Sequence, residues 1–142
     1  MNPEAIVALA RSWIGTPYLH QASAQGLGCD CLGLILGIWR DFYGEIPENI
    51  PPYTPDWSEP QRREHLYAAA LRHLHEKPAP NAAPGDVILF RMRDGGVAKH
   101  MGLQAETGNA PTFVHSYSGH GVVESAFSDP WARRVAARFT FP

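Results

Sequence analysis

The first half of the chain carries apolar residues at helical spacing. Residues 3–14 follow Asn2, a good N-cap, and begin with Pro3, which fits the first position of a helix. Their apolar residues repeat every three to four positions, which predicts a helix with one buried stripe. A second helix is expected over residues 31–43, because its apolar residues recur at the same interval and Gly44 stands where helices favour glycine. Its broad apolar surface predicts that it is the buried, central helix.

Loops separate these helices from a third one. Residues 20–29 contain glycines and are predicted to form a loop, and the prolines within 45–57 exclude regular structure there. Ser58 and Gln61 have the spacing of a capping box, which predicts the start of a helix. We expect this third helix to run to about Lys77, where a proline-rich linker follows it.

Beyond residue 85 the apolar pattern changes from helical spacing to alternation. Glycine-containing or polar turns divide this part into short segments. The predicted strands are 86–92, 97–104, 113–117, 122–125 and 135–141. Helices followed by an antiparallel sheet predict an α+β fold. A length of 142 residues without internal repeats predicts a single domain, residues 1–142.

Composition and charge exclude several classes of protein. Hydrophobic residues make up 44% of the chain and charged residues 18%, which is typical of a folded globular protein. The net charge is −2 and no basic block occurs, so we expect no nucleic-acid partner. No apolar run approaches the roughly 18 residues of a membrane span, so we expect no membrane insertion. Since the N-terminus lacks the pattern of a secretory signal, we expect synthesis in the cytoplasm.

The two cysteines, Cys29 and Cys31, stand at the predicted start of the second helix. A disulfide between them would close a very tight ring, and no second ligand pair suits a zinc finger, so we expect no disulfide, metal or cofactor. A thiol at a helix N-terminus has its pKa lowered by the helix dipole, and the N–H groups there can hold an oxyanion. Cys31 is therefore a candidate nucleophile. The competing interpretation is a buried structural cysteine.

Seven histidines are candidates for the base that a nucleophilic thiol needs. His100 is expected within strand 97–104, where Ala98 and Gly102 share its face and their small size leaves room for a helix N-terminus. His115, on the neighbouring predicted strand, can accept the N–H of His100 and fix its tautomer, or it is an ordinary half-buried sheet histidine. Of the other five histidines, His65, His73 and His75 are expected in solvated positions on the third helix, and His20 and His120 in loops. His20 could line the cleft, but we expect it outside the site.

Five short motifs occur in an order that resembles the NlpC/P60 cysteine peptidases. They are WIGTPY at 13–18, CDCLGL at 29–34, PGDV at 84–87, HMGL at 100–103 and FVH at 113–115. Each motif alone is weak, but together they span nearly the whole chain at fitting spacing. The segment around the two cysteines is most similar to the versions found in phage tail clusters and gene transfer agents.

The resemblance implies a papain-like α+β fold, in which a nucleophile at a helix N-terminus packs on an antiparallel sheet. It implies that Cys31 is the nucleophile, His100 the base and His115 the third, orienting residue. Tyr18 matches a tyrosine that faces the thiol and shapes the oxyanion site. Asp30 matches the acidic residue before the nucleophile, which either binds a substrate amine or caps the helix.

The resemblance also implies a substrate and partners. Family members cut the stem peptides of peptidoglycan, typically between γ-D-glutamate and a diamino acid, and tail-borne versions do so as DNA enters a cell. The expected partners are phage-like tail or baseplate proteins, and the particle would carry the enzyme to the periplasm of the target cell. One departure is Leu32, which stands where the family usually has a serine that helps to recognise substrate, so the bond cleaved stays open.

Two other interpretations remain at this stage. In one, the protein is a structural tail or baseplate component whose hydrolase site is vestigial, which fits the Leu32 departure and the expectation that this chain has no wall-binding domain. In the other, the same thiol and imidazole serve a wall amidase, because acyl-transfer reactions share these groups.

Overall fold

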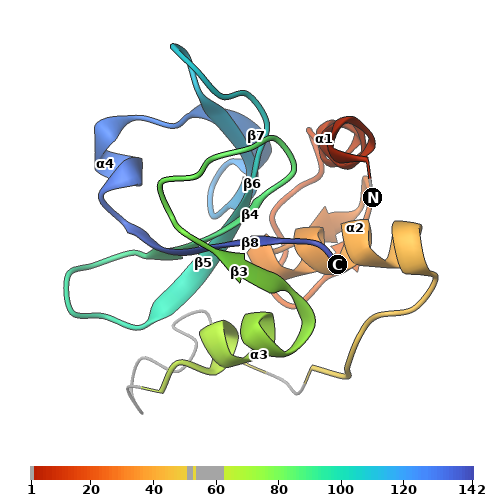
Figure 1. Cartoon of the computed structure of the whole chain (residues 1–142). Helices are drawn as coiled ribbons and strands as arrows, with labels where there is room; N and C mark the ends of the chain where they lie inside the picture. The colour runs from red at the N-terminus through yellow and green to blue at the C-terminus, as the bar shows by residue number, and fades with distance from the viewer. Residues whose placement is uncertain (1, 51–52, 54–62) are drawn as a thin grey trace.

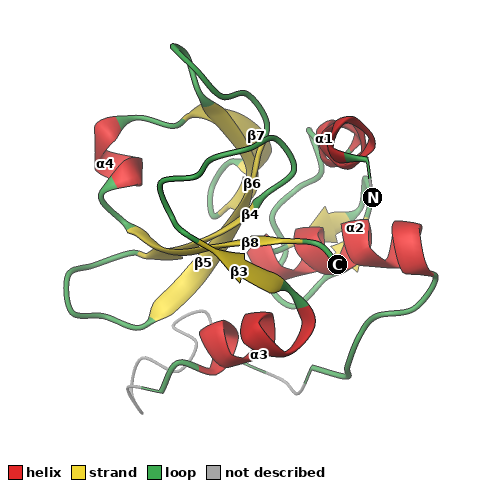
Figure 2. Cartoon of the chain, viewed as in Figure 1, coloured by secondary structure: helices red, strands yellow, loops and turns green. Residues whose placement is uncertain are grey.

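The computed structural model describes residues 2–50, 53 and 63–142 as helices, strands and connecting loops (Figures 1 and 2). Its helices are α1 (Pro3–Ser12), α2 (Cys31–Tyr43), α3 (His65–His73) and α4 (Asp129–Ala132). Its strands are β1 (Ser23–Ala24), β2 (Gly28–Cys29), β3 (His75–Lys77), β4 (Val87–Arg91), β5 (Ala98–Gln104), β6 (Thr112–Tyr117), β7 (Gly121–Ala126) and β8 (Val135–Thr140). The α+β class expected from the sequence is confirmed.

The first two helices form where their end signals predict. The side chain of Asn2 accepts a hydrogen bond from the backbone N–H of Glu4 at 2.8 Å and so caps α1, which ends slightly earlier than expected, at Ser12. The bounds of α2 are those expected, and Gly44 ends it with a φ of 85°, a left-handed conformation that favours glycine. The segment expected as the first loop contains the short antiparallel hairpin of β1 and β2.

The third helix is shorter than the sequence predicts. It begins at His65 and ends at His73, and the expected capping box lies outside the described residues. The last part of the expected helix is instead β3, which pairs antiparallel with β8, so that His75 lies opposite Thr140. The sheet edge offers these backbone groups hydrogen-bond partners, and this tertiary pairing overrides the local helical pattern.

Six strands form one antiparallel sheet in the order β3-β8-β4-β5-β6-β7. The helices α1, α2 and α3 contribute the apolar residues that cover one face and build the main core. The other face carries a smaller cluster around Ile88, Phe90 and Phe113, against which Trp131 of α4 packs. Figure 1 shows α1 and α2 on one side of the sheet and α4 on the other. No helix in the described parts of the chain combines the length and apolar character needed to cross a bilayer.

The sheet opens between β5 and β6, the fourth and fifth strands in this order. Strands β5 and β6 pair only at Leu103–Val114 and Gln104–Phe113, whereas β6 and β7 pair at six positions. In the opening, Ser116 of β6 donates a buried hydrogen bond of 2.7 Å to the carbonyl oxygen of Cys29, just before α2. The N-terminus of α2 is thereby held where the strands separate.

This opening corrects one expectation about β5. Met101 and Leu103 belong to the core that α2 covers, so α2 does not approach the face that carries His100. Gly102 is small for another reason, because a Cβ there would lie 2.8 Å from the ring of Phe113. The tip of α2 and the ring of His100 come from opposite faces and meet through the gap in the sheet.

Candidate active site

Asp30 fixes the start of α2. Its Oδ1 accepts the backbone N–H of Gly33 at 2.7 Å, and its Oδ2 accepts the backbone N–H of Gln21 at 2.8 Å and the hydroxyl of Tyr53. The residue is only 2% exposed, so these donors compensate the burial of its carboxylate. Helix capping, one of the two roles expected for Asp30, is thus present in the structure, and amine binding stays a prediction.

Cys31 places its sulfur at the edge of β5. The Sγ atom lies 3.8 Å from the carbonyl oxygen of Lys99, and the thiol is half-buried. Burial, with a smaller contribution from the Asp30 carboxylate, raises the pKa of the Cys31 thiol to about 12, although backbone N–H groups of Met101 and Leu32 oppose the rise. The expected lowering by the helix N-terminus is therefore outweighed by loss of solvent. The resting group is a neutral thiol.

His100 and His115 form a buried pair. His100 Nε2 lies 2.7 Å from His115 Nδ1, and His115 Nε2 lies 2.9 Å from the hydroxyl oxygen of Ser125. Burial lowers the pKa of His100 to about 3, with a smaller contribution from His115. Burial also lowers the pKa of His115 to about 4, with a smaller contribution from His120. Both rings are neutral near pH 7, as a general base must be.

Aromatic rings enclose this pair. The Trp131 ring centroid lies 5.7 Å from that of His100 and 5.2 Å from that of His115, and Tyr117 stacks on His115 at 5.3 Å. Trp131 comes from the single turn of α4, between β7 and β8. These rings replace water around the imidazoles, which accounts for the lowered pKa values.

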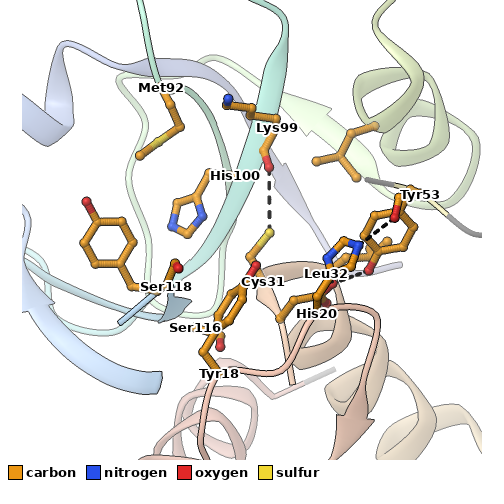
Figure 3. A pocket seen from close by; sticks show the side chains of 13 residues that line it. Tyr18, His20, Cys31, Leu32, Tyr53, Met92, Lys99, His100, Ser116 and Ser118 are labelled. Atoms are coloured by element: carbon orange, nitrogen blue, oxygen red, sulfur yellow. Dashed lines mark hydrogen bonds and ion pairs between the residues drawn. The ribbon is translucent and has the colours of Figure 1, made fainter. Parts of the chain in front are cut away.

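The thiol and the imidazole of His100 reach one pocket of about 250 Å³. Its lining residues are Tyr18, His20, Asp30, Cys31, Leu32, Tyr53, Leu66, Met92, Lys99, His100, Ser116, Tyr117 and Ser118. Figure 3 shows the sulfur of Cys31 directed at the carbonyl of Lys99, with the ring of His100 beside it. His115 lies behind His100 and does not line the pocket. No hydrogen bond joins the sulfur to the His100 ring in this resting arrangement.

Tyr18 reaches the pocket from the segment that follows α1. Its backbone forms an isolated parallel bridge with Cys29, which ties it to the start of α2. Burial raises the pKa of its hydroxyl to about 12, and Cys31 contributes in the same direction. The phenol therefore keeps its proton and is a hydrogen-bond donor at the position expected for it.

The structure corrects the expectation for His20. This side chain lines the pocket, although we expected it outside, and its Nε2 lies 2.6 Å from the carbonyl oxygen of Tyr53. Tyr53 contacts His20 and Asp30 beside the tip of α2, and sequence spacing does not reveal this contact between distant positions. Elsewhere His73 contacts Glu48 at 2.6 Å, and His120 stacks on Tyr117 in an exposed turn.

Several residues around the site were not among those predicted from the sequence. They are Tyr53, Lys99, Ser125 and Trp131. Only strand alternation pointed to Ser125, which shares a face with Val123, the partner of His115. Both cysteines are free thiols, with Cys29 fully buried. Among the described residues no group of three His, Cys, Asp or Glu side chains has the arrangement of a metal site.

Comparison with known proteins agrees with this architecture. No curated protein matches the sequence. Among solved structures, the NlpC/p60 domain of the peptidoglycan hydrolase SagA has a TM-score of 0.67 at 21% identity, covering 99% of this chain and 100% of its own. An NlpC/P60 family protein from Bacillus cereus has a TM-score of 0.67 at 19% identity and covers 99% of this chain. A protein of the same family from Staphylococcus aureus, similar to a lipoprotein, has a TM-score of 0.63 at 20% identity and covers 98%.

These likenesses establish a shared fold. This chain spans all of the SagA domain but only 40% and 41% of the Bacillus and Staphylococcus chains. A model of the NlpC/P60 family matches residues 15–139, which include the segments that carry Tyr18, Cys31, His100 and His115. On this match, the chain belongs to the NlpC/P60 family.

Proposed function

We propose that this protein is a cysteine hydrolase of peptidoglycan peptides, with Cys31 as nucleophile, His100 as general base and His115 as the residue that orients His100. The observation that carries the proposal is the meeting of a helix-terminal thiol and a hydrogen-bonded histidine pair at one pocket. Membership of the NlpC/P60 family supports it, and SagA, whose domain has the same fold, is a peptidoglycan hydrolase.

The reaction begins with a proton transfer. Because the resting sulfur points to the carbonyl of Lys99, rotation about the Cα–Cβ bond of Cys31 must first turn it to His100. His100 Nδ1 then takes the thiol proton, while its Nε2–H remains donated to His115. The neutral thiol of Cys31 and the neutral imidazole of His100 become thiolate and imidazolium only when substrate is present, because the substrate reacts with the thiolate.

The thiolate next attacks the carbonyl carbon of the peptide bond. The oxyanion that forms is stabilised by the neutral hydroxyl of Tyr18 and by the first backbone N–H groups of α2. The imidazolium of His100 gives its proton to the leaving amine, and the acyl group stays on Cys31. Water, deprotonated by His100, then hydrolyses the thioester and restores the free thiol.

The bond we propose is the one between γ-D-glutamate and a diamino acid. Family resemblance supports this choice, and Leu32 is the feature that distinguishes this pocket, because it lines the pocket where the family usually has serine. Mass spectrometry of fragments from digested peptidoglycan identifies the bond. Release of free stem peptides by cleavage next to the sugar would show a wall amidase instead.

The central test is replacement of the nucleophile. Cys31→Ala should abolish release of peptide fragments from purified peptidoglycan, a loss of roughly 10³-fold or more, because no other group supplies the attacking atom. Cys29→Ala is the matched control, since Cys29 is a buried neighbour that does not line the pocket, and it should retain activity when folded. Full activity of Cys31→Ala would refute the proposal.

We further propose that a phage-like tail or baseplate carries this hydrolase to the periplasm of a target cell. The cysteine-containing segment, which resembles tail-borne versions, supports this. Particles that carry Cys31→Ala should assemble normally but deliver DNA poorly into walled cells. Normal delivery by those particles, with failed assembly when the whole protein is deleted, would instead support the alternative of a structural component with a vestigial site.

A further inference from the structure

Lys99 lies directly beside the proposed nucleophile. Its carbonyl oxygen is 3.8 Å from the sulfur of Cys31, at a part of β5 outside its two pairs with β6. The residue is partly buried and lines the pocket, and Figure 3 shows the amine end of its side chain directed toward Met92, which lines the same pocket. A peptide carbonyl that the sulfur attacks therefore has Lys99 as a neighbour.

Lys99 carries the only permanent positive charge among the described residues that line the pocket. The one carboxylate in that lining belongs to Asp30, which is 2% exposed. Asp30 accepts the backbone N–H groups of Gly33 and Gln21 and the hydroxyl of Tyr53, so the protein itself compensates this negative charge. The charge that the pocket offers to a ligand is therefore that of Lys99, and it is complementary to an anionic group of a substrate.

The charge of Lys99 does not activate the thiol in the resting protein. An ammonium close to the sulfur would lower the pKa of Cys31. The lowering that does occur comes from backbone N–H groups, and burial outweighs it. The pKa of His100 is lowered by burial and by His115. Lys99 is therefore better suited to binding substrate than to preparing the reacting groups.

The proposed substrate has an anion at a distance that Lys99 can reach. In a γ-linked glutamyl residue the side-chain carboxyl group forms the peptide bond, so the α-carboxylate stays free. About four carbon–carbon bonds separate this carboxylate from the attacked carbonyl carbon, a span of roughly 5 Å. The four-carbon stem of a lysine lets its amine reach roughly 6 Å from the Cα atom. An amine whose backbone lies beside the sulfur can therefore meet this carboxylate.

We infer that Lys99 is a specificity-determining residue that pairs with the free α-carboxylate of the γ-D-glutamyl residue in the substrate. The substrate class is then stem peptides with an unmodified D-glutamate, and stems whose α-carboxylate is amidated are poor substrates. The inference rests on the proposed function, because it takes the bond after γ-D-glutamate as the one cleaved.

The test compares two synthetic peptides that differ in one group. One is L-alanyl-γ-D-glutamyl-meso-diaminopimelate, and the other carries a carboxamide in place of the glutamyl α-carboxylate. The unchanged protein should cleave the carboxylate peptide with a kcat/KM roughly 10-fold higher, the effect of one charge-assisted hydrogen bond. The difference should lie in KM, because the carboxylate is remote from the bond that breaks, and added salt should reduce it. Equal kcat/KM values for the two peptides would overturn the inference.

Substitution of Lys99 shows whether its ammonium group causes the preference. In Lys99→Met the preference should disappear, because KM for the carboxylate peptide rises about 10-fold, to that of the carboxamide peptide. Lys99→Arg keeps the charge and should keep the preference. Arg93→Met is the matched control, since it removes a positive charge from the exposed turn before β5 that does not line the pocket, and it should also keep the preference. Equal losses on both peptides in Lys99→Met would indicate a structural role and overturn the inference.

Binding measurements separate this inference from the proposed hydrolase activity. In Cys31→Ala, calorimetry should show the carboxylate peptide bound roughly 10-fold more tightly than the carboxamide peptide. If Lys99→Met does not fold, the comparison of the two peptides in the unchanged protein and its salt dependence decide the matter. Selective binding without cleavage by the unchanged protein would refute the hydrolase and support the role of Lys99. Cleavage without selectivity would support the hydrolase and overturn the role of Lys99, and binding of neither peptide would overturn both.

Discussion

At the residue scale, burial sets both reacting groups in their uncharged forms. Loss of solvent raises the pKa of the Cys31 thiol and lowers that of His100, so neither carries charge near pH 7. The helix N-terminus and its N–H groups act on the sulfur, but they act against a larger effect. The reactive ion pair is therefore formed during turnover rather than stored at rest.

This state predicts how stability depends on pH. The unfolded chain takes up a proton at His100 below about pH 6.5, whereas the folded protein does so only near pH 3. The contribution of His100 to the free energy of unfolding is thus fully present above pH 6.5 and is lost as pH falls toward 3. Between pH 7 and pH 5 this loss is about 2 kcal/mol. Urea unfolding at pH 7 and pH 5 measures the change in the free energy of unfolding. This change should be smaller in His100→Asn than in the unchanged protein.

A matched control separates this effect from general acid sensitivity. His75→Asn, at an exposed position of β3, should leave the pH dependence as it is in the unchanged protein. Equal slopes for the His100 variant and the unchanged protein would contradict the argument.

Sequence spacing predicted Cys31, His100 and His115 as a group, and the structure brings them together. It did not predict the direction of the Cys31 pKa, because burial depends on how the strands and loops close over a helix tip. Tyr53 and His20 were missed for the same reason. Their contact joins residues that are 33 positions apart, with α2 between them, and no local pattern predicts it.

At the element scale, α4 determines how far water is excluded from His100 and His115. Its single turn has Ser128 before it and Pro130 within it, but four residues are too few to give a helical period, and the sequence analysis did not predict it. The same limit applies to β3, where pairing with β8 overrode a helical pattern. Longer elements such as α2 were predictable because apolar spacing and end signals agreed.

Trp131→Ala tests the role of α4. Removing the ring admits water to His100 and His115, so the pKa of each should rise toward 6.5, because burial is the main cause of its lowering. The acidic limb of kcat/KM should move to higher pH, since the base is then protonated sooner. Stability should fall by about 2 kcal/mol, less than for a fully buried aromatic residue.

Trp39→Ala provides the comparison. Trp39 packs on Tyr43, Phe141 and His73 and makes no ring contact with His100 or His115. It should lower stability without moving the pH profile, and a profile that shifts equally in both variants would rule out a specific effect of Trp131.

At the scale of the whole molecule, a cluster of charged side chains around Asp86 connects the sheet to the linker that precedes β4. Asp86, only 2% exposed, contacts Arg138 at 3.1 Å and Lys77 at 3.0 Å, and accepts the backbone N–H of Ala83 at 2.9 Å. Arg138 also donates to Gln104 on β5. The sequence motif at 84–87 therefore has a structural role in holding β4, β5 and β8 together.

Asp86→Asn should be strongly destabilising, by about 3 kcal/mol, because it leaves the buried Arg138 without its anionic partner. Urea unfolding measures the change. Arg11→Ala is the matched control, since Arg11 makes exposed bridges to Glu106 and Glu124 and should cost less than about 1 kcal/mol. Similar losses in the two variants would contradict a special contribution from burial.

The gap between β5 and β6 has a consequence for amide hydrogen exchange. In most sheets the middle strands hold their protons longest, because they open only when the whole molecule unfolds. Here β5 and β6 are both inner strands, but they share few pairs, so amide protons along their boundary should exchange faster. Protection against exchange should then be highest in two separate strand pairs, β4 with β8 and β6 with β7. The active site would therefore lie at the boundary between two parts of the sheet that open independently.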